Sequence, residues 1–473
     1  MVKSNTDSIM HVKYDTNPNF TNPITSNKIQ HANNSTDYTA VVKLDKLKAN
    51  TQYYYQVWFS HPDNKSNIVS QPSIKGLFRT APDSTHQKNI ISFVVGGDLG
   101  GQKYCERFGL GYPIFSIIRD LAPDFFISNG DKIYADGDCS AKGPVSVTGW
   151  HNIAGNISGV SAKNVNWTDI NQVRNIFNKH WEYNRSDKSI QGLLSNTSLY
   201  SQADDHEVIN NYGNWSYWSD LTKNRTGFIN LVNSGIQTFF DFSPIDKNNT
   251  NPHQIYLHFN WGKDMDLFIL DARSHRDRND LSQNFSSANK TPFGKEQLQW
   301  LERGLLKSNS TWKIVSDDDP IFIPVGCQND GSHSPLGCDG WATDGNTTLN
   351  FANERNQFLK FLDDHNIKNV IFITTDVHYP ANIISNQDFN KDGHKLTLYE
   401  LVSGPLTAGP TDKPGRLDPT VNDTYLYKEG KLFNFGYYKI QKNIKDGKAH
   451  FISEIRGIDD LTRPESYLDL TPQ

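Results

Sequence analysis

Acidic residues stand directly after four apolar, strand-like runs of this sequence. The runs and the acids that follow them are 90–95 with Asp98, 125–128 with Asp131, 312–315 with Asp317, Asp318 and Asp319, and 370–373 with Asp376. Converging carboxylates repel one another by several kcal/mol at a separation of about 4 Å unless a cation lies between them. The pattern therefore predicts a site for more than one metal ion, whereas a role as turn formers or helix caps would explain only single instances.

Amphipathic helices are predicted before three of these strands. The apolar residues of 114–121, 298–305 and 358–362 recur at the spacing of one buried helix face. Near-continuous apolar strands that alternate with such helices indicate an α/β fold in which the sheet is covered on both faces. Ligands of open α/β sheets bind beyond the carboxyl ends of the strands, which is where the acids would lie.

The first 85 residues have a different, all-β pattern. Alternation in 38–44 is followed by a turn near 48–50 and by the aromatic run 53–59. The stretch 44–55 resembles the corner of a fibronectin type III or immunoglobulin-like sandwich, but only four or five strands fit before Thr80 where about seven are expected. We therefore expect a sandwich domain over 1–85 that lacks its first strands, in a chain shortened at its amino end, and a catalytic domain over 86–473.

The composition excludes several classes of protein. A net charge of −5 over 473 residues and a pI near 6.3 provide no broad basic field, so nucleic acid is expected only as a substrate. No apolar run approaches the roughly 18 residues that a membrane-spanning helix needs. The four cysteines lack the spacing of a zinc site. No pattern indicates an oligomeric state.

Two features bear on the cellular location. Cys327 and Cys338 flank a polar segment that a disulfide would close in an oxidising compartment, although two free thiols explain them equally well. Sixteen Asn-x-Ser/Thr sequons modestly favour a glycosylated, exported protein. The segment 1–5 does not begin like a secretory signal. We therefore expect a secreted or cell-surface protein whose signal is not part of this chain.

Four short motifs resemble those of a known enzyme superfamily. Asp98-Leu99-Gly100, Gly130-Asp131-Lys132-Ile133-Tyr134 and Asp205-His206-Glu207 look like the DxG, GDxxY and (N/D)HE motifs of binuclear metallophosphoesterases, in the order of purple acid phosphatases. Thr375-Asp376-Val377-His378 stands in place of the final GHxH. The preceding β-sandwich, together with 203–212 and 270–276, narrows the resemblance to PhoD-like alkaline phosphatases and phosphodiesterases. The resemblance implies a four-layer α/β/β/α catalytic domain and metal-dependent hydrolysis of phosphate esters.

The same resemblance implies two sets of metal ligands. The first metal would be bound by Asp98, Asp131, Tyr134 and His378, and the second by the bridging Asp131 with Asp205, Asp376 and Asp318. Asp318, with Asp317 as the alternative, stands where the superfamily has a further histidine. Hard oxygen donors around Tyr134 suit iron, and the all-oxygen second site favours calcium, or manganese or magnesium. PhoD-like enzymes resemble such an iron–calcium design, but they often carry a cysteine where this chain has Asp98.

The implied reaction is in-line attack of a metal-activated hydroxide on phosphorus. His206 would protonate the leaving group or bind the phosphoryl oxygen, or else hold Asp205 from behind. Arg273 and Arg276 would clamp the phosphate, or else pair with structural acids near Asp271. The long irregular segments 137–166 and 321–350 would form walls of the site.

A second class of function stays open beside hydrolysis. A non-catalytic cell-surface binding protein could keep the fold and one structural cation without turning substrate over. The complete set of motif acids, with Tyr134, His206 and His378, argues against such decay. The motifs do not distinguish a phosphomonoester from a diester or a phospholipid head group.

Overall fold

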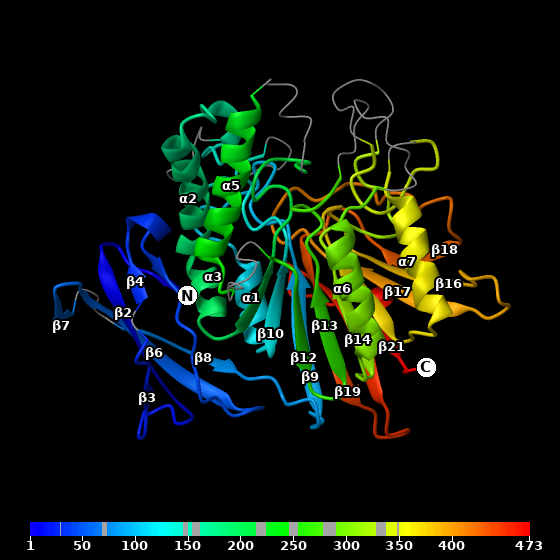
Figure 1. Cartoon of the computed structure of the whole chain (residues 1–473), viewed down its shortest axis with the longest axis horizontal. Coiled ribbons are helices and arrows are strands. Elements are labelled where there is room, and N and C mark those ends of the chain that lie inside the picture. Colours follow the sequence, from blue (N-terminus) through cyan, green and yellow to red (C-terminus); the bar gives the residue numbers. More distant parts are fainter. Residues whose placement is uncertain are drawn as a thin grey trace.

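Two β-sheets packed face to face form the centre of the protein (Figure 1). This computed structural model describes residues 1–28, 30–68, 73–144, 150–153, 161–213, 224–245, 254–277, 290–327, 337–347 and 350–473, with the backbone alone for 64–68. Apolar side chains of both sheets, among them Phe93, Ile127 and Ile314, interdigitate in a fully buried core between them.

The first sheet has the strand order β11-β10-β9-β19-β20-β21. Its strands are β9 (Ile90–Gly96), β10 (Phe125–Asn129), β11 (Ser198–Gln202), β19 (Asn434–Lys442), β20 (Ala449–Gly457) and β21 (Leu468–Leu470). The three strands β9, β10 and β11 run parallel, so their carboxyl ends meet at one edge. The predicted strands 90–95 and 125–128 are confirmed as β9 and β10.

The second sheet has the strand order β12-β13-β14-β15-β17-β16-β18. Its strands are β12 (Leu257–Trp261), β13 (Met265–Ile269), β14 (Trp312–Ser316), β15 (Val370–Thr374), β16 (Ala381–Gln387), β17 (Leu396–Val402) and β18 (Asp423–Lys428). Strands β13, β14, β15 and β17 are parallel. The predicted strands 312–315 and 370–373 are confirmed as β14 and β15, and the structure shows that they are neighbours. The acids that follow the four predicted strands therefore come from two sheets.

Helices cover the outer faces of the two sheets and complete the predicted α/β/β/α layers. The helices among the described residues are α1 (Ile114–Asp120), α2 (Ile170–Ser186), α3 (Lys188–Leu194), α5 (Arg225–Phe242), α6 (Gly294–Lys307) and α7 (Ala352–Asp364). Helices α1 and α3 pack on the first sheet, and α6 and α7 pack on the second. Leu301 and Leu305 of α6 and Phe358 of α7 are buried there, as their helical spacing predicted.

Two buried amides join the sheets at the edge where their parallel strands end. Asn129, the last residue of β10, donates its Nδ2 to the carbonyl oxygens of Asp317 and Ile373 at 2.9 and 3.3 Å. Gln202, the last residue of β11, donates its Nε2 to the carbonyl oxygens of Leu270 and Ser316 at 3.1 and 3.2 Å. Because these amides hydrogen-bond across the interface, they hold the strand ends of one sheet in register with those of the other.

The amino-terminal residues form β-strands on one side of the molecule, beside helices α2, α3 and α5 (Figure 1). They are β1 (Val2–Lys3), β2 (Ser8–Asp15), β3 (Ile24–Thr25), β4 (Gln30–Ala32), β5 (Thr39–Ala40), β6 (Gln52–His61), β7 (Asn64–Ile68) and β8 (Ile74–Arg79). The described residues before Thr80 thus contain eight strands, and the predicted four or five is too low. Four of the eight have only two or three residues, which is too short for a period-2 pattern.

The β-rich region is attached to the rest of the protein through the end of α3. The carbonyl oxygen of Ser195 accepts hydrogen bonds from the Tyr55 hydroxyl at 3.1 Å and from the Leu77 backbone N–H at 2.9 Å. Lys3 forms an ion pair of 3.1 Å with Glu182 of α2. These contacts place the β-rich region against the helices and away from the carboxyl ends of the parallel strands.

The structure bears on two features predicted from the sequence, the glycosylation sequons and the lack of a membrane-spanning helix. The Asn184 sequon does not lie on the surface, because this side chain is 6% exposed and donates its Nδ2 to the carbonyl oxygen of Lys132 at 2.8 Å. The sequons at Asn156, Asn214, Asn248, Asn284 and Asn289 lie outside the described residues. None of the described helices is long and apolar enough to span a bilayer.

Candidate metal centre

The predicted ligand residues stand on the loops that follow β9, β10, β11, β14 and β15. Asp98, Asp131, Asp376 and His378 adopt positive φ angles of 60°, 46°, 66° and 59°. L-residues rarely adopt this left-handed conformation, and such backbone strain is concentrated at functional sites. Strands β9, β10 and β15 therefore end in sharp turns that carry these acidic and histidine side chains.

Asp98, Tyr134 and His378 form the first group. Nε2 of His378 lies 3.4 Å from Oδ1 of Asp98 and 3.0 Å from the Tyr134 hydroxyl. The Nδ1 atom of His378 donates a hydrogen bond of 2.7 Å to the carbonyl oxygen of Gly409. This bond leaves Nε2 as the unprotonated nitrogen that faces the two oxygen donors, as histidine ligands of metals require.

Asp131, Asp205 and His206 form the second group. Their possible ligand atoms all lie within 4.8 Å of one another. Nε2 of His206 is 4.0 Å from Oδ2 of Asp131 and 3.8 Å from Oδ1 of Asp205. The ring centroids of His206 and Tyr134 are 4.1 Å apart, so the two groups adjoin.

Glu207, which sequence reasoning missed as a functional residue, holds the loops of this second group together. Its Oε2 accepts hydrogen bonds from the backbone N–H groups of Asp131 at 3.1 Å and Asp204 at 2.8 Å. Its Oε1 accepts the N–H of Lys132 at 2.6 Å. Glu207 is fully buried, so one carboxylate fixes the loop after β10 relative to the loop after β11. Its place in the Asp205-His206-Glu207 motif was the available signal.

Asp136 is a second residue that sequence reasoning missed. Its Oδ1 lies 2.5 Å from Nδ1 of His206, and its Oδ2 lies 2.8 Å from Nζ of Lys163. Burial lowers the pKa of His206, but the carboxylates of Asp136 and Asp205 outweigh burial and raise this pKa to about 9. The position of Asp136, two residues after Tyr134, was its only signal in the sequence.

Arg273 and Arg276, for which either a phosphate clamp or pairing with structural acids was predicted, pair with buried acids in the structure. Arg273 is fully buried, and its guanidinium lies 2.6 Å from Asp204 and 2.8 Å from Asp339. Arg276 is 4% exposed and lies 2.5 Å from the other oxygen of Asp339. Both guanidinium groups are buried and paired with buried carboxylates.

Asp318 is paired with the buried Arg273. It is fully buried, and its Oδ2 is 3.4 Å from Nε of Arg273. Among the described residues it joins no group of three converging metal-ligating side chains. Asp317, the alternative, accepts a hydrogen bond of 3.0 Å from the backbone N–H of Asp318. Asp376 is half-buried at the end of β15, and its Oδ2 has no hydrogen-bond partner.

Two models of known protein families match this chain and show the family to which it belongs. Residues 93–451 match the family described as PhoD-like phosphatase, and residues 2–82 match the amino-terminal domain of PhoD-like phosphatases. The chain belongs to the PhoD-like phosphatase family. The first match alone covers more than half of the chain and includes every predicted ligand.

Individual relatives support the assignment to the PhoD-like family. Alkaline phosphatase D of Bacillus subtilis is 26% identical over 392 residues, which are 80% of this chain and 59% of that protein. The chain thus spans less than two thirds of the length of this curated relative. A solved structure of PhoD matches 100% of this chain and 87% of its own, with a TM-score of 0.69 and 19% identity. A purple acid phosphatase from seeds of yellow lupin (Lupinus luteus) matches 98% of this chain and 70% of its own, with a TM-score of 0.55 and 14% identity. These two structural similarities concern the fold.

The donor set of this PhoD-like chain fits metal cations. Both carboxylate oxygens of Asp98, Oδ2 of Asp131 and Oδ1 of Asp205 are buried and have no hydrogen-bond partner. Burial, reinforced by neighbouring carboxylates, raises the pKa of Asp98, Asp131 and Asp376 well above the ordinary value. Buried anionic oxygens without partners are costly unless a cation satisfies them, so the residues present suit metal ions.

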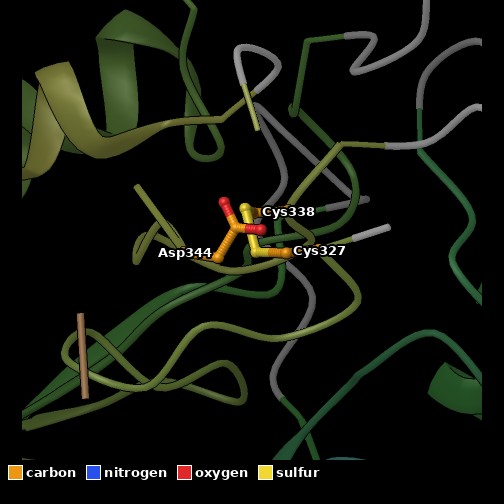
Figure 2. Close-up of side chains that lie close together, drawn as sticks. All are labelled: Cys327, Cys338 and Asp344. Atoms are coloured by element: carbon orange, nitrogen blue, oxygen red, sulfur yellow. A yellow bond between two sulfur atoms is a disulfide. The ribbon is translucent and has the colours of Figure 1, made fainter. Parts of the chain in front are cut away.

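A second convergence of possible ligands in this chain is not a metal site. Cys327, Cys338 and Asp344 lie together, but the two sulfur atoms form a disulfide (Figure 2). The thiolate is the form that binds metals, so these oxidised sulfurs offer no ligand. Of the two predicted states of this pair, the structure has the disulfide. A second disulfide, which was not predicted, joins Cys105 and Cys139.

Proposed function

We propose that this chain hydrolyses phosphate esters with the help of bound metal ions. The carrying observation is the convergence of Asp98, Tyr134 and His378 with Asp131 and Asp205 at one edge of two sheets, with several of their oxygens unpartnered. A chain of the PhoD-like phosphatase family with this donor set has the parts that phosphoester hydrolysis requires.

The proposed ligands of the two metal ions come mainly from the two groups of converging side chains. Asp98, Tyr134 and His378 would hold the first metal ion, Asp131 would bridge, and Asp205 with Asp376 would hold the second. Asp318 would join the second set only by exchanging its contact with Arg273 for one with the metal. The phenol of Tyr134 and the carboxylates of Asp98 and Asp131 would suit iron as the first metal ion. The oxygen-only set of Asp131, Asp205 and Asp376 would suit calcium, manganese or magnesium as the second.

Metal ions in these positions would supply Lewis acidity towards the phosphoryl oxygens and lower the pKa of water. His206 would hydrogen-bond the phosphoryl oxygen or give its Nε2 proton to the leaving oxygen. Asp136 holds Nδ1 of His206, so Nε2 is the nitrogen that faces Asp131 and Asp205. His206 is 14% exposed, which leaves its ring edge accessible to a substrate.

The described parts of the two predicted wall segments support a substrate site beside His206. Lys163, from segment 137–166, reaches the carboxylate of Asp136. Asp339, from segment 321–350, pairs with both Arg273 and Arg276. Residues 145–149, 154–160, 328–336 and 348–349 of these segments lie outside the described residues.

The experiment that tests this function compares p-nitrophenyl phosphate with bis-p-nitrophenyl phosphate. The purified chain is stripped of metals and then assayed with Ca²⁺, Mn²⁺, Mg²⁺ and iron, singly and in pairs. Hydrolysis that depends on added metal and is lost in Asp131→Asn supports the proposal, and the preferred ester assigns the substrate class. Metal binding without hydrolysis of either ester would instead support the non-catalytic binding protein.

We also propose two domains, 1–85 and 86–473, in a secreted or cell-surface glycoprotein. The change from the β-rich region to the α/β layers between β8 and β9 supports the boundary. The two disulfides support an oxidising compartment, where such bonds persist. Limited proteolysis tests the boundary: cleavage between Asp83 and Asn89 that leaves an active fragment supports it, and cleavage only elsewhere contradicts it.

A further inference from the structure

The Cys105–Cys139 disulfide joins the two loops that carry Asp98 and Tyr134 of the first group. Cys105 belongs to the loop that starts at Asp98, and Cys139 belongs to the loop that carries Tyr134. The Sγ atoms of Cys105 and Cys139 lie 3.5 and 3.9 Å from the carbonyl oxygen of Gly100. The two cysteines are 0% and 3% exposed, so the bond is part of the interior.

The backbone beside this disulfide is in close contact with the ring of Tyr134. A Cβ atom at Gly101 would lie 2.4 Å from Cζ of Tyr134, which is closer than any real side chain allows. Only glycine can therefore approach the phenol this closely. The ring of His206 and Nε2 of His378 also neighbour the phenol. Gly101 thus forms one wall of the space in which Tyr134 is held.

Asn152 joins the same two loops from the other side. Its Oδ1 accepts hydrogen bonds from the Cys105 backbone N–H at 3.2 Å and from Nε1 of Trp150 at 2.9 Å. Its Nδ2 donates to the carbonyl oxygens of Lys103 and Ser140, both at 2.9 Å. These bonds and the disulfide cross-link the loop after β9 to the loop after β10 within a few residues of Asp98 and Tyr134.

We infer that Cys105 and Cys139 are positioning residues of the metal centre: their disulfide keeps the Gly100–Gly101 turn against Tyr134, and so holds Tyr134 and Asp98 at the separation that metal binding needs. This inference rests on the proposed metal centre. The Cys327–Cys338 disulfide joins two residues of the segment 321–350 and converges with Asp344, which is not a proposed ligand, so it serves as a matched control.

The test uses the full chain in three disulfide states: wild type, Cys105→Ala/Cys139→Ala and Cys327→Ala/Cys338→Ala. Metal-free samples are titrated with Mn²⁺ alone by calorimetry, and thermal unfolding is followed in parallel. Removing supporting contacts of a metal site weakens metal affinity by about 10- to 100-fold. We expect a loss in that range for the first variant and wild-type affinity for the second, at a temperature where both remain folded.

A fourth protein, Gly101→Ala, keeps both disulfides and displaces the phenol directly. We expect it to weaken Mn²⁺ binding as Cys105→Ala/Cys139→Ala does. If the Cys105/Cys139 variant unfolds at lower temperature but binds Mn²⁺ as wild type does, the disulfide only stabilises the fold and the inference is overturned. Equal weakening in both disulfide variants would overturn it as well.

The proposed function can fail separately from this inference. A wild-type protein that binds Mn²⁺ with the expected dependence on Cys105 and Cys139, but hydrolyses no ester, would contradict the function and support the inference. Ester hydrolysis with unchanged Mn²⁺ affinity in Cys105→Ala/Cys139→Ala would overturn the inference and leave the function.

Discussion

Asp136 holds His206 by a contact of 2.5 Å between Oδ1 and Nδ1, across a sequence separation of 70 residues. Lys163 approaches the second oxygen of the same carboxylate at 2.8 Å. The Asp136 carboxylate thereby fixes the ring of His206 and raises its pKa, whereas burial acts in the opposite direction. Both the orientation and the pKa of His206, which is proposed to contact substrate, therefore depend on Asp136.

Replacing Asp136 by Asn should move the alkaline limit of activity to lower pH. Without the carboxylate the pKa of His206 falls, so the protonated form is lost at a lower pH than in wild type. The measurement is kcat against pH for p-nitrophenyl phosphate. Lys163→Met serves as the control, since it removes the neighbouring cation and should shift the limit the other way. An unchanged pH profile in both variants would show that His206 does not act as an acid.

Replacing His206 by Ala should lower kcat by about 10²- to 10⁴-fold, the range of a general acid or base, while the metal content stays the same. The reason is that the side chain is proposed to touch substrate and not to hold metal. Elemental analysis and steady-state kinetics on the same preparation measure both quantities. Metal loss in step with activity would mean that His206 is itself a ligand.

Replacing Asp131 by Asn should abolish activity together with metal binding. Asp131 is the proposed bridging ligand, and the change removes its charge while keeping its size. Asp412→Asn, whose carboxylate is 77% exposed, is the control and should retain both. Full metal content in Asp131→Asn would contradict the bridging role.

Adding metal to the metal-free protein should release protons. Burial and mutual repulsion raise the pKa of Asp98, Asp131 and Asp376 in the absence of metal, so part of these groups is protonated before the metal binds. Calorimetry in buffers of different ionisation enthalpy counts the protons. Metal binding without proton release would argue against the carboxylates as ligands.

If Tyr134 binds ferric iron, a phenolate-to-metal absorption band should also colour the protein and disappear in Tyr134→Phe.

Replacing Arg273 by Met should destabilise the fold by about 3–5 kcal/mol, the range for breaking a buried ion pair by removing one partner. The change leaves the carboxylates of Asp204, Asp319 and Asp339 without their shared cation. Urea unfolding measures the loss. Lys360→Met breaks the exposed pair with Asp364 and should cost far less, because solvent screens a pair of exposed charges. A small loss of unfolding free energy in Arg273→Met would contradict a structural role of Arg273 and favour its predicted role in phosphate binding.

The sequence alone determined the order of the strands and of the acidic residues that follow them. Strand β9 before Asp98, β10 before Asp131 and β15 before Asp376 could be predicted because apolar runs, helix spacing and turn residues are local signals. The carboxyl ends of parallel strands share one edge, so the convergence of the acids within each sheet also followed from local information. The meeting of Asp98 and Asp131 of the first sheet with Asp376 of the second depends on how the two sheets pack. The four-layer fold came from the resemblance of the motifs, which span residues 98–378 of the chain.

Only the tertiary structure decided which partners these residues have. Arg273 could equally have bound phosphate or acids, and its pairing with Asp339 depends on how the segment after β14 returns to the sheet edge. The contact of Asp136 with His206 and the bond between Cys105 and Cys139 join loops that no periodicity relates. Such contacts form between residues distant in the chain, and their geometry is set by the packing of two sheets rather than by the spacing of residues along one strand or helix.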